Sequence, residues 1–291
     1  MCAIRTVFID ISIVVASPDR KGFPLRIPRF PLAFIAAAGG LIGPGIEAAR
    51  GGAWLMPPGE GQVIADTSFS DSSHAFDAQG HLIPVSSYKK FELGTYIEYG
   101  LTNWLTVVAS PSYDRIDNPP PGQSYNGPGE SEIAARVGLY RTDTCVLSFQ
   151  AGLRSPGGSF ADSLGPFGVR RAASLDVRGL AGRNVVVAGM EGFVEAQAGY
   201  RFYAAGQPGE WRIDLTMGLR PWPRLLVMLQ SFTSIVNGSL QFGHVSWTKL
   251  QPGLVYDIAP QWSVQIGGFI TVAGINAGRE LGSTAGIWYR F

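Results

Sequence analysis

The sequence predicts an all-β fold, a transmembrane, antiparallel, up-and-down β-barrel of about 12 strands in a single domain. Three observations lead to this prediction. Apolar and polar side chains alternate along many segments of the chain, which places them on opposite faces of strands. Charged residues make up only 15% of the 291 residues, against roughly 25% in ordinary soluble domains. The chain also ends on an alternating aromatic segment, from Leu281 to Phe291.

Residues 1–49 are expected to be a leader and signal peptide that precede a barrel of residues 50–291. Arg26 and Arg29 stand before an apolar stretch, and a small-residue region follows it, which is the order of a secretory signal. Residues 1–25 fit poorly in front of that signal because two aspartates interrupt their apolar run. We therefore hypothesise that they lie upstream of the true translation start. The alternative is a disordered cytosolic leader.

Alternation with a period of two residues identifies the strands one after another. In the clearest segment, Trp211, Ile213, Leu215, Met217 and Leu219 alternate with arginine, aspartate, threonine and glycine residues. Helical spacing does not fit such segments. A soluble β-sandwich remains the alternative fold. The expected strands span residues 61–73, 88–100, 103–115, 129–141, 144–154, 172–181, 191–203, 210–221, 224–236, 242–258, 261–273 and 281–291.

The connections between these strands favour the membrane barrel over the sandwich. An even number of strands places both termini at one side, and short turns are expected there while long loops lie at the other side. The expected segments follow this rule, except that 182–190 is a rather long turn on the side of the termini. Trp104, Trp222 and Trp262 stand beside the short turns, where an aromatic girdle is expected.

The last strand also suggests where the protein is located. It resembles the closing strand of bacterial outer-membrane barrels, whose terminal phenylalanine is recognised by the barrel-assembly machinery. The resemblance implies that Phe291 contacts this machinery and that the barrel lies among lipids of the outer membrane of a Gram-negative bacterium. The formal net charge is only +1, so nothing indicates a nucleic-acid partner.

Charged residues occupy inward positions on one side of the predicted barrel. A buried charge is costly unless it is paired, so one interpretation is that these residues pair and stabilise the barrel. The other interpretation is a two-sided channel for an amphipathic or aromatic solute, because the inward positions of the ninth and eleventh strands carry no charge. The expected lumen-lining residues are Glu132, Arg136, Arg154, Asp176, Arg178, Glu195, Arg201, Arg212 and Asp214.

Residues for catalysis or metal binding are sparse. His244 and Ser246 share one face of the tenth strand, and a His-x-Ser pair on a barrel rim resembles outer-membrane phospholipases and lipid A deacylases. No residue that would orient the imidazole can be assigned, so we expect no catalytic residue and keep acyl hydrolysis as an alternative. His74 and His81, with nearby aspartates, are too loosely spaced to predict a metal site. We expect no cofactor.

Several stretches of the chain carry a family resemblance. They include KKFELGTYIEYGLTNWLTVVAS from Lys89, and GGFITVAGINAGRELGSTAGIWYRF at the end of the chain. The chain resembles outer-membrane proteins of the meta-pathway of phenol degradation transporter type. The resemblance implies passage of small, hydrophobic or aromatic compounds, and it supplies no site residues. A structural barrel, or one associated with polysaccharide export, is a further alternative.

Overall fold

The computed structural model describes residues 52–119, 124–157, 172–239 and 243–291. All of them belong to one compact unit, residues 39–291. The expected leader and signal peptide lie outside the described residues. In the described part of the chain, no helix is long and apolar enough to cross a membrane.

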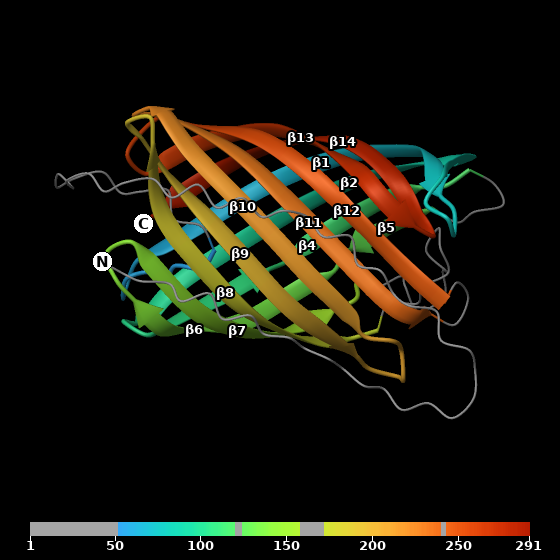
Figure 1. Cartoon of the computed structure of the whole chain (residues 1–291), viewed down its shortest axis with the longest axis horizontal. Coiled ribbons are helices and arrows are strands. Elements are labelled where there is room, and N and C mark those ends of the chain that lie inside the picture. Colours follow the sequence, from blue (N-terminus) through green and yellow to red (C-terminus); the bar gives the residue numbers. More distant parts are fainter. Residues whose placement is uncertain (1–51, 120–123, 158–171, 240–242) are drawn as a thin grey trace. The chain divides into compact units, whose positions relative to one another are not determined.

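The described residues form fourteen β-strands in one antiparallel sheet (Figure 1). The strands are β1 (Gly61–Phe76), β2 (Leu82–Thr102), β3 (Leu105–Ser110), β4 (Ser112–Asp117), β5 (Tyr125–Pro128), β6 (Ser131–Arg141), β7 (Cys145–Ser155), β8 (Ser174–Val187), β9 (Met190–Tyr203), β10 (Glu210–Trp222), β11 (Leu225–Ser239), β12 (Gly243–Asp257), β13 (Trp262–Ile275) and β14 (Ala277–Arg290).

Two of the barrel strands are interrupted. β3 and β4 both pair with β2 and are separated only by Pro111, so they form one barrel strand. β5 pairs with β4 and β6 pairs with β3, so they form the next one. Proline lacks the N–H that a continuous strand would donate, which accounts for the interruption at Pro111. The fourteen segments therefore make the twelve barrel strands that the alternation predicts.

The sheet closes because its first and last strands pair. Gln62 to Asp71 of β1 lie in antiparallel register with Arg290 to Leu281 of β14. The closure extends to the last residue, since the N–H groups of Gly61 and Phe291 each donate to the other's carbonyl oxygen, over 2.8 and 3.0 Å. The sequence-based prediction of a closed antiparallel barrel is thus confirmed, and the soluble sandwich is excluded for this part of the chain.

The two faces of the wall differ as the alternation predicts. On β10, Trp211, Ile213, Leu215 and Met217 are exposed on the outside, whereas Asp214 is buried inside. The same separation recurs around the wall, so the outer face is apolar and the polar side chains point inward. Trp104, Trp222 and Trp262 are exposed near the end of the barrel where β1 begins and β14 ends.

Several predicted strand boundaries are wrong. β8 extends to Val187 and β9 begins at Met190, so residues 182–190 are not a long turn. Ala188 and Gly189 alone connect the strands, and both have positive φ, as a tight hairpin turn requires. β2 begins at Leu82 rather than near residue 88, which reduces the expected long loop of residues 74–87 to residues 77–81.

Candidate functional site

Nearly all of the predicted lumen charges form a connected ladder of ion pairs on the inner face. The strands β6 to β10 carry these charges at inward positions, so arginines and carboxylates on neighbouring strands face each other. The guanidinium of Arg201 lies 3.3 Å from Asp176 and 3.3 Å from Glu210. Further pairs join Arg154 to Glu130 and Glu132, Arg178 to Asp176 and Asp214, and Arg212 to Glu210.

Arg136 is the most completely buried member of the predicted set. Its guanidinium donates to Glu98 at 2.6 Å, to the hydroxyl of Tyr96 at 2.8 Å and to the side-chain oxygen of Gln150. It also donates to the backbone carbonyl of Trp54 at 3.1 Å. Because three of these acceptors belong to the wall and the Trp54 carbonyl belongs to a chain segment inside it, Arg136 joins that segment to the barrel wall.

That segment comprises residues 52–57, and we call it the inserted segment. It precedes β1 and runs inside the barrel, where Ala53, Trp54 and Leu55 are buried. Its backbone is hydrogen-bonded to the wall at several points. The N–H of Ala53 donates to Glu195 at 2.9 Å, and the N–H of Met56 donates to the hydroxyl of Thr106 at 2.9 Å. The hydroxyl of Ser148 donates to the Ala53 carbonyl at 2.8 Å.

Inward-facing glycines make room for the inserted segment. A Cβ atom at Gly100 would lie 2.1 Å from the Pro57 carbonyl oxygen, and one at Gly182 would lie 2.5 Å from the Trp54 indole. A Cβ atom at Gly138 would lie 3.0 Å from Leu55. These glycines belong to β2, β8 and β6. Three strands thus lack a side chain at positions where the inserted segment contacts the wall.

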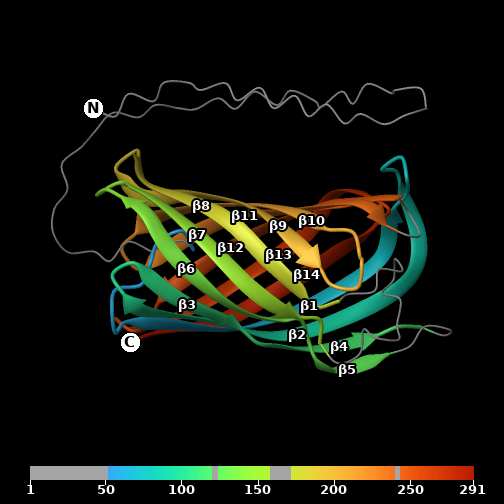
Figure 2. The same ribbon diagram turned by 90° about the horizontal axis from the view of Figure 1, so that it is seen from below.

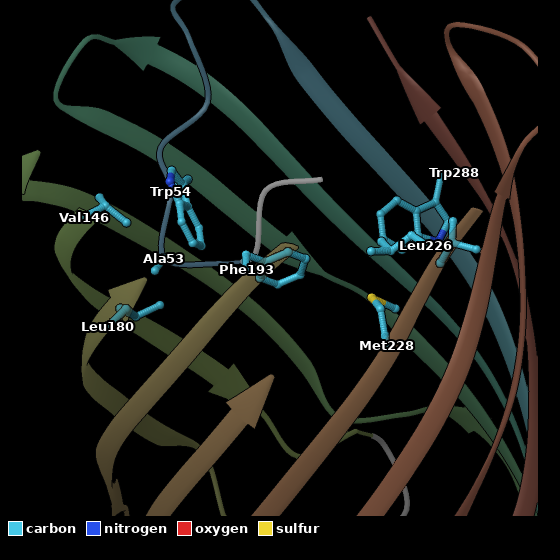
Figure 3. Close-up of a cluster of buried hydrophobic side chains, with 9 residues drawn as sticks. Ala53, Trp54, Val146, Leu180, Phe193, Leu226, Met228 and Trp288 are labelled. Carbon is cyan, nitrogen blue, oxygen red and sulfur yellow. The ribbon is translucent and has the colours of Figure 1, made fainter. Parts of the chain in front are cut away.

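An apolar layer surrounds the inserted segment (Figure 3). Trp54 and Phe193 make an edge-to-face contact with 6.0 Å between ring centroids. Side chains from several strands complete the layer, and all of them are inward-facing residues near the end of the barrel where β1 begins and β14 ends. They are Val146, Leu180, Leu226, Met228, Val255 and Trp288. This layer and the inserted segment narrow the lumen at that end.

The inner face of strands β11 to β14 is mostly neutral and aromatic, but it is not free of charge. Lys249 of β12 pairs with Glu280 of β14 at 2.6 Å. The Lys249 ammonium also lies 4.6 Å from the Phe269 ring centroid and 5.6 Å from the Trp247 ring centroid. From the ionic wall, Arg212 reaches over the same Trp247 ring at 5.5 Å. Cations and aromatic rings are therefore neighbours on the inner face of β10, β12 and β13.

Sequence reasoning missed part of this site. Glu130 and Glu210 complete the ion-pair ladder, and Glu210 has the same parity as Arg212 and Asp214 on its strand, so alternation could have identified it. The inserted segment was missed entirely. It lies before the first strand, has no periodicity, and is recognisable only by the glycines that face it.

The remaining sequence candidates lie outside the lumen. Ser246 lies opposite Ile235 and Ile275, whose side chains face outward, and His244 shares its parity, so the pair belongs to the outer face of β12. Asp77 caps a turn between β1 and β2, where its carboxylate accepts the N–H groups of Gln79 and His81. The hydrogen bond from the His81 N–H is the main cause of its lowered pKa. Within the described residues, no group of three or more potential ligands could hold a metal ion.

The barrel is similar to solved structures of outer-membrane channels. The COG4313 outer membrane channel from Pseudomonas putida F1 matches 84% of this chain and 100% of its own, with a TM-score of 0.68 and 14% identity. The KdgM porin matches 78% of this chain and 99% of its own, with a TM-score of 0.50 and 8% identity. No protein-family model and no curated protein sequence matches the chain. At these identities the likeness shows the fold, and the chain has the barrel fold of outer-membrane channels.

Proposed function

We propose that the protein is an outer-membrane channel for small solutes and that the inserted segment sets its narrowest point. The observation that carries this proposal is that a separate chain segment, rather than wall side chains alone, occupies the lumen beside the ionic ladder. The apolar outer face supports placement in a membrane, because it leaves large hydrophobic side chains exposed around the wall.

The residues inside the barrel also favour one class of solute. Strands β6 to β10 carry paired arginines and carboxylates, and the adjoining strands β11 to β13 carry Met228, Trp247 and Phe269. An amphipathic solute would contact both sets of strands at once, with polar groups on the ladder and apolar groups on the rings. This agrees with the small hydrophobic or aromatic compounds that the phenol-degradation transporter resemblance implies. The nine predicted lumen residues would line the path of such a solute.

Two measurements test the channel proposal. Protein refolded into planar bilayers is expected to conduct ions in small steps, and liposomes that contain it are expected to take up phenol faster than protein-free liposomes. A control for leak is a larger neutral sugar, which a barrel narrowed by the inserted segment would exclude. Absence of both conductance and solute uptake by correctly folded protein would favour a structural or polysaccharide-export-associated barrel instead.

The proposal assigns no catalytic role to His244 and Ser246. Both belong to the outer face, outside the lumen where the solute would pass. We expect the purified protein to release no fatty acid from phospholipid micelles. Acyl hydrolysis that Ser246→Ala abolishes would contradict this expectation and would make the protein a barrel enzyme.

A further inference from the structure

One pocket lies on the outside of the barrel wall, where the apolar surface gives way to charged side chains. On three neighbouring strands this change occurs within two residues, from Phe69 to Asp71 on β1, from Phe91 to Lys89 on β2, and from Tyr113 to Arg115 on β4. The register places Phe69 opposite Phe91 and Asp71 opposite Lys89, so the boundary runs at one level across the strands.

This boundary belongs to the half of the barrel remote from the C-terminus. β4 and β5 lie toward the end opposite the C-terminus (Figure 2). Phe69 stands eight positions along β1 from Gly61, which pairs with the end of the chain. At about 3.3 Å per residue and a strand tilt of roughly 40°, this spans about 20 Å along the barrel axis. An apolar band of about 25 Å therefore ends near this level.

The pocket has an apolar floor and a charged rim. It is an open hollow of about 430 Å³, lined by Phe69, Phe91, Tyr113, Lys89, Arg115, Asp117 and Asn126. The three aromatic side chains are each more than one-third exposed, although they lie on a surface that contacts lipid if the barrel spans a membrane. In a bilayer, an acyl chain is the group that fills an apolar hollow on this face.

The rim leaves one cation available. Arg115 pairs with Asp117 at 3.4 Å, and the hydroxyl of Ser87 donates to Asp71 at 3.2 Å. Among the described residues, Lys89 has no hydrogen-bond or ion-pair partner. Two carboxylates, Asp71 on β1 and Asp117 on β4, lie opposite Lys89 in the strand register, but its ammonium forms an ion pair with neither of them. The exposed Arg115 guanidinium lines the same pocket and uses only its Nε in the pair with Asp117.

We propose that this pocket is a binding site for a phosphorylated membrane lipid of the lipid A type. One acyl chain would lie on Phe69, Phe91 and Tyr113, and a headgroup phosphate would accept hydrogen bonds from Lys89 and Arg115. The site is separate from the lumen, and it rests on the membrane placement proposed above. Its failure would leave the channel proposal intact, because conductance and uptake measure the lumen alone.

The test is native mass spectrometry of the full barrel, released from detergent micelles that contain lipid A. We expect one lipid A to stay bound to the wild type, and at least tenfold weaker binding to the double variant Lys89→Gln, Arg115→Gln. The matched control is Arg183→Gln, Arg224→Gln, which removes the same charge from exposed positions elsewhere on the barrel and is expected to bind normally. Phe91→Ala is expected to weaken binding while leaving both cations in place.

Two further ligands identify what the pocket recognises. Inorganic phosphate is expected not to compete with lipid A at equal concentration, since it cannot use the aromatic floor. A diacylglycerol without phosphate is expected to bind no better to the wild type than to the double variant. Equal lipid A binding by the wild type and the double variant, or full competition by inorganic phosphate, would overturn the proposal. Unchanged elution and β-type circular dichroism show that each variant is folded.

Discussion

Replacing Trp54 with alanine tests whether the inserted segment limits passage through the barrel. Trp54 is only 8% exposed and packs edge to face against Phe193 inside the lumen. Truncating such a buried tryptophan costs about 3–5 kcal/mol. The backbone hydrogen bonds of Ala53 and Met56 and the one that the Trp54 carbonyl accepts survive the change, and each contributes about 1 kcal/mol. The segment should therefore loosen without being released entirely.

The expected effect on the channel follows from these magnitudes. A loss of about 3–5 kcal/mol shifts the ratio of displaced to seated segment by roughly 10²- to 4 × 10³-fold, at about 1.4 kcal/mol per factor of ten. In planar bilayers we expect Trp54→Ala to show frequent steps of larger conductance that the wild type rarely shows. Trp211→Ala is the matched control, because it removes an indole from the outer face, where Trp211 is 53% exposed. Equal conductance of Trp54→Ala and wild type would refute the reasoning.

Three further predictions concern stability and assembly. Arg136→Ala leaves the buried Glu98 carboxylate without its cation and is expected to lower the free energy of unfolding by about 3–5 kcal/mol in urea titrations. The control is Arg115→Ala, which breaks an exposed ion pair and should change the free energy of unfolding by less than about 1 kcal/mol. Gly100→Ala would place a methyl group against the Pro57 carbonyl, so the inserted segment should become accessible to protease while the barrel stays resistant. Deletion of Phe291 removes the last backbone contacts to Gly61 and should reduce the folded barrel recovered from outer-membrane fractions; normal recovery would argue against recognition of this residue during assembly.

The sequence was sufficient to predict the wall of the barrel. On β10 apolar residues occupy the outward positions and mostly polar residues occupy the inward positions. The period of two residues is therefore visible in the sequence without knowledge of the strand register. Alternation does not identify a strand where outward and inward positions carry residues of similar polarity. Val185, Val186 and Val187 continue β8 without alternating, and the prediction consequently ended that strand too early.

The lumen was harder to predict because its chemistry depends on contacts between distant parts of the chain. The nine charged residues could be placed inward from parity alone, but their partners depend on the register of five strands. The space for the inserted segment depends on three glycines that are far apart in the sequence, Gly100, Gly138 and Gly182. Each one resembles an ordinary strand glycine until the folded wall places all three against the same segment.

The pairing of β1 with β14 has a consequence for how the molecule is made. The wall is a complete ring only where the final strand pairs with the first, so a sheet in which β1 and β14 have not yet paired is open along that edge. Residues 52–57 precede β1 by three residues and contact strands β2, β6 and β8 in the closed barrel. The wall can thus wrap around them, and no threading through a finished cylinder is needed.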